Sequence, residues 1–295
     1  MKPTLARLGE TGLLDLLTRR WNYDRRVLTG VGDDCAVLRG QGTYLLFKTD
    51  AVVEGVHFTS KTPAHLIGRK ALARALSDIA AMGGRPLAAL VTIGLPPNEP
   101  VARLRGIYRG LEKIARELKV NLVGGETTRA RGLFLSIALL GECRGHHPVL
   151  RSTARAGDLL YVTGRLGATQ ARRHLTFTPR LAEGEWLARH HIASSMMDLS
   201  DGLGADLPRL ARASRLSFRV DPKALPRARG ATVEAAWNDG EDYELLFTVS
   251  PSRAKTLKKK WPVATPLHCI GEMRPFREGA GRAGSAHGFD HFKQR

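Results

Sequence analysis

Short apolar segments alternate with longer helical patterns along the whole chain, and this alternation restricts the possible folds more than any other feature of the sequence. A chain of this kind must bury strands and helices against each other in layers. Apolar leucines followed by Trp21 predict an amphipathic helix near the N-terminus, over about 13–21. In the first half we expect further helices at 62–82 and 100–118, and strands at 44–49, 86–94, 121–124 and 133–141.

The same alternation begins again after a polar, turn-rich segment at 144–148. The glycine-flanked segment 164–167 predicts a turn that leads into a helix. We expect further helices at 179–190, 202–214 and 251–261, and strands at 158–163, 195–198, 217–220, 242–249 and 267–272. A length of 295 residues exceeds one typical domain. The sequence therefore predicts an α/β (α+β) protein with an N-terminal domain of residues 1–147 and a C-terminal domain of residues 148–295.

Several classes of protein are excluded by the composition. Hydrophobic residues make up 43% and charged residues 25% of the chain, which is typical of a globular protein. The longest apolar stretches, near 87–95 and 133–140, are shorter than the roughly 20 residues that span a bilayer. No secretory signal follows Met1, and three scattered cysteines form neither a disulfide framework nor a metal knuckle. We therefore expect a soluble, cytoplasmic protein that does not bind membranes.

The charge of the chain is strongly basic, with 46 Lys and Arg against 28 Asp and Glu, a formal net charge of +18. This excess fits binding to a polyanion, such as nucleic acid or a phosphorylated metabolite, but also a general preference for arginine. The few acids are more informative, because many stand in tight groups. Carboxylates that repel one another at close range usually bind divalent cations. The groups are Asp33 with Asp34, Asp50 with Glu54, Asp198 with Asp201 and Asp206, and 239–244.

Motifs for the commonest nucleotide and hydrolytic sites are absent. The sequence contains no GxxxxGK[ST] loop, no HExxH and no GxSxG. Six acidic motifs stand in their place, and each combines carboxylates with glycine or a hydroxyl residue. They are Gly30-Val-Gly-Asp-Asp-Cys-Ala36, Thr49-Asp-Ala-Val-Val-Glu-Gly-Val-His-Phe58, Leu76-Ser-Asp-Ile-Ala-Ala-Met-Gly-Gly84, Val123-Gly-Gly-Glu-Thr-Thr128, Met197-Asp-Leu-Ser-Asp-Gly-Leu203 and Asp239-Gly-Glu-Asp-Tyr-Glu-Leu-Leu246.

Each motif also has a purely structural interpretation. The pair that begins at Asp33 could be a solvated turn, and Asp78 could form a salt bridge with Arg74 four residues earlier in the same helix. Ser200 is a natural N-cap that would place Asp201 in the first turn of a helix. An N-cap does not explain Asp198, which ends a strand. Two carboxylates beside a helix N-terminus suit a complex of Mg²⁺ with phosphate.

Taken together and in this order, the six motifs resemble the thiamine-monophosphate kinase family, part of a superfamily that includes aminoimidazole ribonucleotide synthetase. The resemblance extends from Gly30 to the closing segment 288–292. It implies a two-domain fold of that superfamily, in which the N-terminal sheets of a homodimer form a barrel-like core. The implied activity is transfer of a phosphoryl group from ATP to thiamine monophosphate, assisted by several Mg²⁺ ions, and it gives thiamine diphosphate.

The resemblance also assigns roles to individual residues. No residue is expected to act as a general base, because a phosphate monoester is already largely ionised at neutral pH. The metal ligands would be Asp33, Thr49, Asp50, Asp78, Glu126, Asp198 and Asp201. Gly125, Glu126, Arg151 and Ser200 would contact ATP, and His57, Glu241 and Phe289 would contact the thiamine substrate.

Three positions depart from the family's pattern. Glu126 replaces an aspartate, Lys48 replaces a small hydroxyl residue, and Asp239 replaces a glycine. The first two put individual metal contacts in question. Three alternatives therefore stay open: another ATP-using enzyme of the superfamily, a ligand-binding homologue without activity, and a basic nucleic-acid-binding protein. The last has little support, because aromatic residues are only 6% of the chain and no nucleic-acid-binding module is present.

Overall fold

The computed structural model describes residues 4–169 and 172–276, and each half of the chain forms a β-sheet with helices packed against it. A six-stranded sheet in the first half has the order β1-β2-β3-β6-β4-β5. Its strands pair antiparallel except for β4 and β5, which run parallel. The strands are β1 (Val27–Thr29), β2 (Ala36–Arg39), β3 (Thr43–Val53), β4 (Arg85–Leu95), β5 (Asn121–Arg129) and β6 (Phe134–Arg144).

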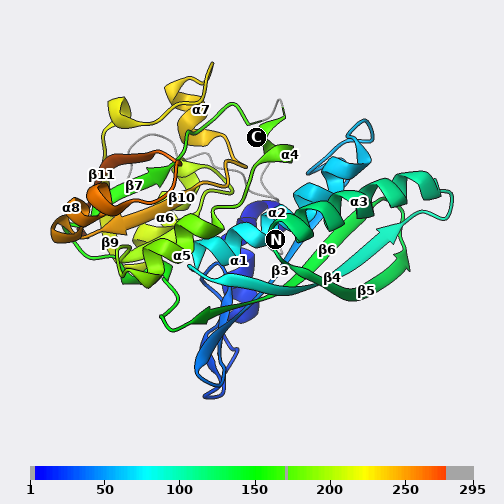
Figure 1. Cartoon of the computed structure of the whole chain (residues 1–295), viewed down its shortest axis with the longest axis horizontal. Helices are drawn as coiled ribbons and strands as arrows, with labels where there is room; N and C mark the ends of the chain where they lie inside the picture. The colour runs from blue at the N-terminus through cyan, green and yellow to red at the C-terminus, as the bar shows by residue number, and fades with distance from the viewer. Residues whose placement is uncertain (1–3, 170–171, 277–295) are drawn as a thin grey trace.

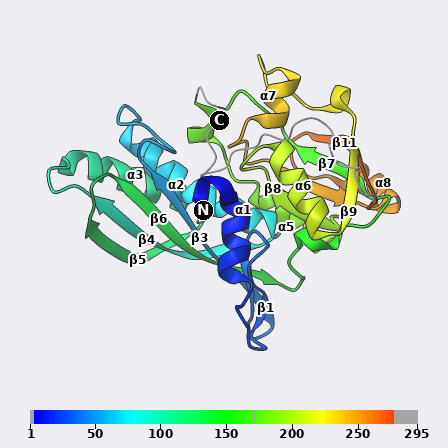
Figure 2. The same ribbon diagram turned by 180° about the vertical axis from the view of Figure 1, so that it is seen from behind.

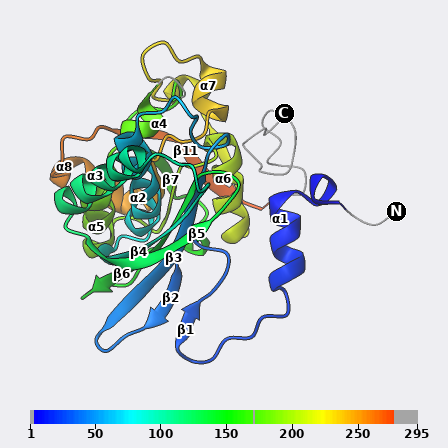
Figure 3. The same ribbon diagram turned by 90° about the vertical axis from the view of Figure 1, so that its right-hand side faces the viewer.

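Two helices, α2 (Ala64–Ala81) and α3 (Val101–Glu117), cover one face of this sheet (Figures 1 and 3). They approach each other closely because glycines face the contact. A Cβ on Gly68 would lie 1.9 Å from the carbonyl oxygen of Ile107, and one on Gly110 would lie 1.9 Å from that of His65. The predicted helices 62–82 and 100–118 are confirmed. On the opposite face, Phe47 and Leu90 stay exposed within the part of the chain that the structure describes.

The second sheet has five antiparallel strands in the order β8-β10-β7-β11-β9. Its strands are β7 (Leu159–Thr163), β8 (Ser195–Asp198), β9 (Leu216–Val220), β10 (Leu245–Val249) and β11 (Leu267–Pro275). Side chains alternate between its two faces, and each face has its own apolar core. Met197 and Leu246 pack with α6 (Leu203–Ala213), whereas Met196 and Phe247 pack with α5 (Leu181–Arg189) and α8 (Pro251–Lys260).

Helix α2 makes much of the contact between the two halves, and its last turns pack closely on α5. Ala80 and Ala81 belong to the same buried cluster as Leu187 of α5. A Cβ on Gly184 would lie 2.0 Å from the carbonyl oxygen of Ala80, so the two helices touch through their backbones. Figure 2 shows the two lobes side by side. The strands of the first sheet end at Arg144 and those of the second begin at Leu159; the division at residue 147 stays a prediction.

The opening helix, α1 (Leu5–Thr18), is present but leaves much of its apolar surface uncovered. Leu14, Leu16 and Leu17 are between 44% and 57% exposed. Figure 3 shows α1 standing apart from the layered body. None of the helices within residues 4–169 and 172–276 combines the length and apolarity that crossing a membrane requires.

Two sequence predictions fail in the second half. No helix follows the turn at 164–167 directly, because Asp242 and Asp239 accept hydrogen bonds from the amides of Gly167 and Ala168. Ala168 has a φ of 56°, and the next helix is the short α4 (Arg173–Thr176). The strand expected at 242–249 begins only at Leu245, because Tyr243 has a left-handed φ of 51°. The sequence also gave no signal for β1, β2 or the six-residue α7 (Val233–Asn238).

Candidate functional site

Three buried carboxylates meet where the two halves of the chain adjoin. Asp34 precedes β2, Asp78 lies on α2 and Asp198 ends β8, and each offers an oxygen within 4.8 Å of the others. All three residues are less than 8% exposed. Hard oxygen ligands at such spacing are the donor set that Mg²⁺ and Ca²⁺ take in proteins, so the residues fit a divalent cation. Asp78 and Asp198 are therefore brought together as the sequence predicted.

Arg151 holds both acids of the first motif. Its guanidinium donates to the two carboxylate oxygens of Asp34, at 2.5 and 3.1 Å, and its backbone amide donates to Asp33 at 3.1 Å. Because such a two-bond contact fixes the carboxylate plane, the orientation of Asp34 is set by protein groups. Arg151 also lies at the start of a short turn of helix that links the two halves. The interpretation of Asp33 and Asp34 as a solvated turn is wrong.

Two ion pairs join β3 to α2. Lys48 and Asp50 are two residues apart on the inward face of β3, and Arg74 and Asp78 are four residues apart on α2. Lys48 Nζ lies 3.1 Å from Asp78 Oδ1, and Arg74 Nε lies 3.2 Å from Asp50 Oδ2. The sequence-based alternative, a salt bridge between Arg74 and Asp78, is therefore wrong, because the neighbouring strand supplies a partner to each.

The acids of the cluster are hard to ionise together. Burial and the charge of Asp34 raise the pKa of Asp33 and of Asp198 to about 7. Burial also raises the pKa of Asp78 well above its ordinary range, although the Lys48 ammonium opposes this. Asp198 accepts a hydrogen bond of 2.6 Å from the hydroxyl of Ser77. A cation that binds here would relieve the repulsion, which is how clustered carboxylates usually acquire a metal.

The segment after Asp198 differs from the sequence prediction. Helix α6 begins at Leu203, and its N-cap is Gly202 with a φ of 99°, so Ser200 does not cap it. The left-handed glycine turns the chain before the helix starts, and a Cβ there would lie 2.7 Å from the carbonyl oxygen of Asp239. Asp201 consequently stands before the helix, where it pairs with Arg209. The backbone carbonyl of Ser200 accepts a hydrogen bond from the amide of Glu241.

Two predicted metal ligands lie away from the buried cluster. Thr49 stands between Lys48 and Asp50 on β3, so its side chain is on the opposite, exposed face, 3.3 Å from the hydroxyl of Ser136. Glu126 is exposed on the edge strand β5, where its carboxylate accepts from the amide of Thr127. Neither belongs to the group of Asp34, Asp78 and Asp198. Their metal contacts remain predictions.

Gly125 precedes Glu126 at a point of close backbone approach. Its φ is 150°, and a Cβ there would lie 1.9 Å from the carbonyl oxygen of Val91 on β4. Any larger residue would push the edge strand away from its neighbour. This explains the glycine by packing alone, and its predicted contact with ATP stays a prediction.

The predicted substrate contacts gather around a buried lysine. Lys70 on α2 is fully buried, with its ammonium 2.6 Å from Glu241, 2.7 Å from the carbonyl oxygen of His57 and 2.8 Å from His174 Nδ1. Burial opposes ionisation of Glu241, but His174 and the Lys70 ammonium outweigh it and lower its pKa to about 2. His57 and Glu241 are thus brought together through Lys70. Phe289 lies outside the described residues.

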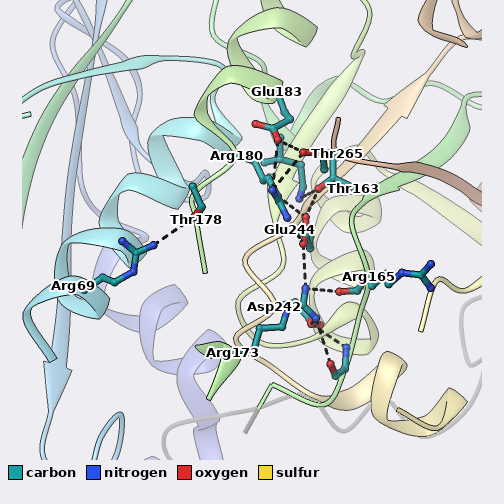
Figure 4. A network of polar contacts seen from close by, with 12 residues as sticks. Arg69, Thr163, Arg165, Arg173, Thr178, Arg180, Glu183, Asp242, Glu244 and Thr265 are labelled. Atoms are coloured by element: carbon teal, nitrogen blue, oxygen red, sulfur yellow. Dashed lines mark hydrogen bonds and ion pairs between the residues drawn. The ribbon is translucent and has the colours of Figure 1, made fainter. Parts of the chain in front are cut away.

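A polar network fixes the loop that carries Glu241 (Figure 4). Arg180 donates to both carboxylate oxygens of the buried Glu244 at 2.7 Å, and Thr163 donates to the same group at 2.7 Å. Arg173 lies 3.1 Å from Glu244 and 3.4 Å from Asp242. These contacts tie β7, α4 and the start of α5 to the segment between Glu241 and β10, so the chain just after Glu241 is held in place.

Three residues of the site were not among the predicted ligands. Asp34 and Ser77 each stand next to a predicted ligand, so the motifs contained them without a role. Lys70 had a usable signal, since Lys70, Arg74 and Asp78 follow one another at steps of four along α2. In a helix this spacing forms one stripe, and three charged residues in a stripe between apolar neighbours indicate internal ion pairs.

Comparison with known proteins identifies the family. Residues 32–143 match the family model described as AIR synthase related protein, N-terminal domain. The thiamine-monophosphate kinase of Rhodopirellula baltica is 34% identical to this chain, and the alignment covers 90% of this chain and 89% of the relative. The thiamine-monophosphate kinase of Salmonella typhimurium is also 34% identical, and the alignment covers 90% of this chain and 92% of the relative. A solved structure described as AaThiL complexed with AMPPCP and TMP is 29% identical, with a TM-score of 0.87 over 99% of both chains. This chain therefore belongs to the thiamine-monophosphate kinase family.

Proposed function

We propose that this chain transfers the γ-phosphoryl group of ATP to thiamine monophosphate. The observation that carries this proposal is the similarity over 99% of both chains to a structure that holds AMPPCP and TMP. It is supported by two curated relatives of the same family that match about nine-tenths of the chain. The acidic cluster at the junction of the two halves is the part of the site that suits phosphate chemistry.

Positioning and charge neutralisation are the main requirements of this reaction. The acceptor is a phosphate monoester, which is already largely ionised at neutral pH, so no side chain has to remove a proton from it. When bound, Mg²⁺ would supply positive charge that reduces the repulsion between two polyanions. We assign its binding in the cluster to Asp33, Asp50, Asp78 and Asp198, together with Asp34. Thr49, Glu126 and Asp201 are proposed as further ligands.

Side chains of this chain would bind and orient the two substrates. Arg151 is already oriented by Asp34 and would bind phosphate of ATP, together with Gly125, Glu126 and Ser200. Glu241, His57 and Phe289 are proposed to contact the thiamine part. The carboxylate of Glu241 suits a cationic thiazolium ring, because its lowered pKa keeps it charged at every pH at which the enzyme would work.

We propose that the molecule is a homodimer that covers the open face of the first sheet. Phe47 on β3, Leu90 on β4 and Val123 on β5 are 51%, 46% and 59% exposed. The uncovered apolar residues of α1 lie outside the core as well. Large exposed apolar side chains on one sheet face are typical of a surface that binds another chain.

A coupled assay of ADP release tests the proposed reaction. Purified protein with ATP and Mg²⁺ should release ADP when thiamine monophosphate is added, and product analysis should show thiamine diphosphate in equal amount. Formylglycinamidine ribonucleotide, the substrate type of the aminoimidazole ribonucleotide synthetase alternative, serves as the control. Turnover with that compound and none with thiamine monophosphate would refute the proposal. Sedimentation equilibrium tests the homodimer separately.

A further inference from the structure

The Lys48 side chain places a positive charge inside the acidic cluster. The side chains of Lys48 and Asp78 are only 27% and 10% exposed, and their charged atoms lie 3.1 Å apart. Asp50, Asp34 and the thiol of Cys35 are the other titratable groups that face the ammonium. The contact is therefore an internal ion pair, unlike the surface pairs that contribute little.

The spacing of strand and helix makes this pair part of a matched set. Residues two apart on β3 are separated by about 6.6 Å, and residues four apart on α2 by about 6 Å along the helix. Lys48 can therefore face Asp78 while Asp50 faces Arg74. The two pairs alternate in sign, so each carboxylate has one cation and each cation one carboxylate. Moving Lys48 away would disturb the whole set.

A divalent ion and the Lys48 ammonium compete for the same place. Mg²⁺ binds a carboxylate oxygen at about 2.0–2.1 Å. An ion on Asp78 Oδ1 in the direction of Lys48 would overlap the ammonium, which stands 3.1 Å from that oxygen. The ammonium has no lone pair in its charged form and cannot act as a ligand. Lys48 thus fills a cation position and adds no ligand.

We propose that the Lys48 ammonium acts as a built-in cation that replaces one divalent metal ion at the Asp78 end of the acidic cluster. Metal then binds among Asp34, Asp78 and Asp198, and no second ion binds on the side of Asp78 that the ammonium occupies. The chain therefore needs fewer bound ions before nucleotide arrives than its number of carboxylates suggests. This inference rests on the proposed function only in that both use the same carboxylates.

Binding of Mn²⁺ to the full chain tests the proposal without nucleotide or thiamine monophosphate. The number of bound ions and their Kd are measured by electron paramagnetic resonance for wild type, Lys48→Met and Lys48→Arg. Lys113→Met on the exposed surface of α3 is the matched control. We expect Lys48→Met to bind one more Mn²⁺, or to bind it at least threefold more tightly, while Lys48→Arg and the control behave as wild type. The same number of ions with a Kd within threefold, or weaker binding, would overturn the proposal.

A measurement on the unaltered chain guards against a variant that does not fold. Crystals of wild-type protein soaked in Mn²⁺ should show anomalous scattering among Asp34, Asp78 and Asp198 and none at the position of the Lys48 ammonium. A manganese peak on Asp78 with Lys48 displaced would overturn the proposal. Because neither readout uses turnover, an absence of kinase activity would refute the proposed function and leave this inference to be decided by metal binding alone.

Discussion

Lys70→Met should destabilise the protein by about 3 kcal/mol at pH 7. The ammonium of Lys70 is fully buried and bonds to Glu241, His57 and His174 at 2.6 to 2.8 Å. Methionine keeps most of the volume of lysine and removes its charge. The variant therefore leaves the Glu241 carboxylate without its closest counter-charge, and breaking a buried pair from one side costs about 3–5 kcal/mol. We take the lower end because the Glu241 side chain keeps 21% exposure.

The pKa of Glu241 shows that its surroundings favour the charged carboxylate. Its fall from an ordinary 4.5 to about 2 corresponds to about 3 kcal/mol of stabilisation, to which the hydrogen bond with His174 contributes as well as the Lys70 ammonium. A carboxylate with a lowered pKa stabilises the folded state above its unfolded pKa, and this contribution is lost as the pH falls from about 4.5 through about 2. In Lys70→Met the buried carboxylate binds a proton more readily. The cost of the variant should therefore be largest at pH 7 and should shrink towards pH 5.

Urea unfolding at pH 5, 6 and 7 measures these effects, with Lys113→Met as the exposed control on a neighbouring helix. The double variant Lys70→Met/Glu241→Gln completes a double-mutant cycle. It should lose about 2 kcal/mol less than the sum of the single variants, because neither charge is then left unpaired. A cost below about 1 kcal/mol at pH 7, the same cost at pH 5, or strict additivity would each refute the reasoning. If Glu241 contacts the substrate, the KM for thiamine monophosphate should rise in Lys70→Met with a smaller change in kcat.

Three further predictions concern the acidic residues. Asp198→Asn should abolish turnover yet stabilise the metal-free protein by about 2 kcal/mol at pH 8. Burial and Asp34 raise the pKa of Asp198 to about 7, so its charged form is costly above that pH. Thermal unfolding at pH 5.5 and 8 checks this, and a lower Tm of the variant at pH 8 would contradict it. Exhaustive treatment with EDTA should remove all kinase activity, with recovery on adding Mg²⁺; activity that survives would show that the carboxylates are structural. Glu126→Asp should keep activity, whereas Glu126→Gln should lose most of it, because the amide keeps the length of the side chain and loses its charge. Kinetics of both variants are measured at several Mg²⁺ concentrations. Equal, near-wild-type values for the two variants would place Glu126 outside the metal site.

Long elements with clear ends could be predicted from the sequence. The 18-residue helix α2 has apolar residues at helical spacing, and it is stopped just before Gly83, whose φ of 71° suits only glycine readily. The strand β8 was predicted with its bounds because four buried residues precede an acid–glycine motif. The three- and four-residue strands β1 and β2 are too short to show a period. They form because β3 offers an edge, which is a tertiary effect.

Pairing between distant elements could not be predicted in the same way. Opposite charges four residues apart in a helix usually interact, and this rule favoured a salt bridge between Arg74 and Asp78. The preference for hydroxyl residues at helix N-termini favoured Ser200 as the N-cap of α6. Both rules describe an isolated helix. Here β3 brings a better partner to each charge, and the left-handed Gly202 starts α6 later. The motifs and the family resemblance therefore indicated the residues of the site, whereas local rules failed on their contacts.

Several of the clustered acids have basic partners inside the fold. From the sequence, the clustered acids seemed to lack partners and to require several metal ions. In the structure, Arg151 holds Asp34, Arg74 holds Asp50, and Arg209 holds Asp201. Among the three carboxylates that meet at the junction, Asp198 is the one whose hydrogen-bond partner is a neutral hydroxyl. The need for a metal ion is therefore concentrated at Asp198, while arginines and Lys48 already neutralise much of the rest.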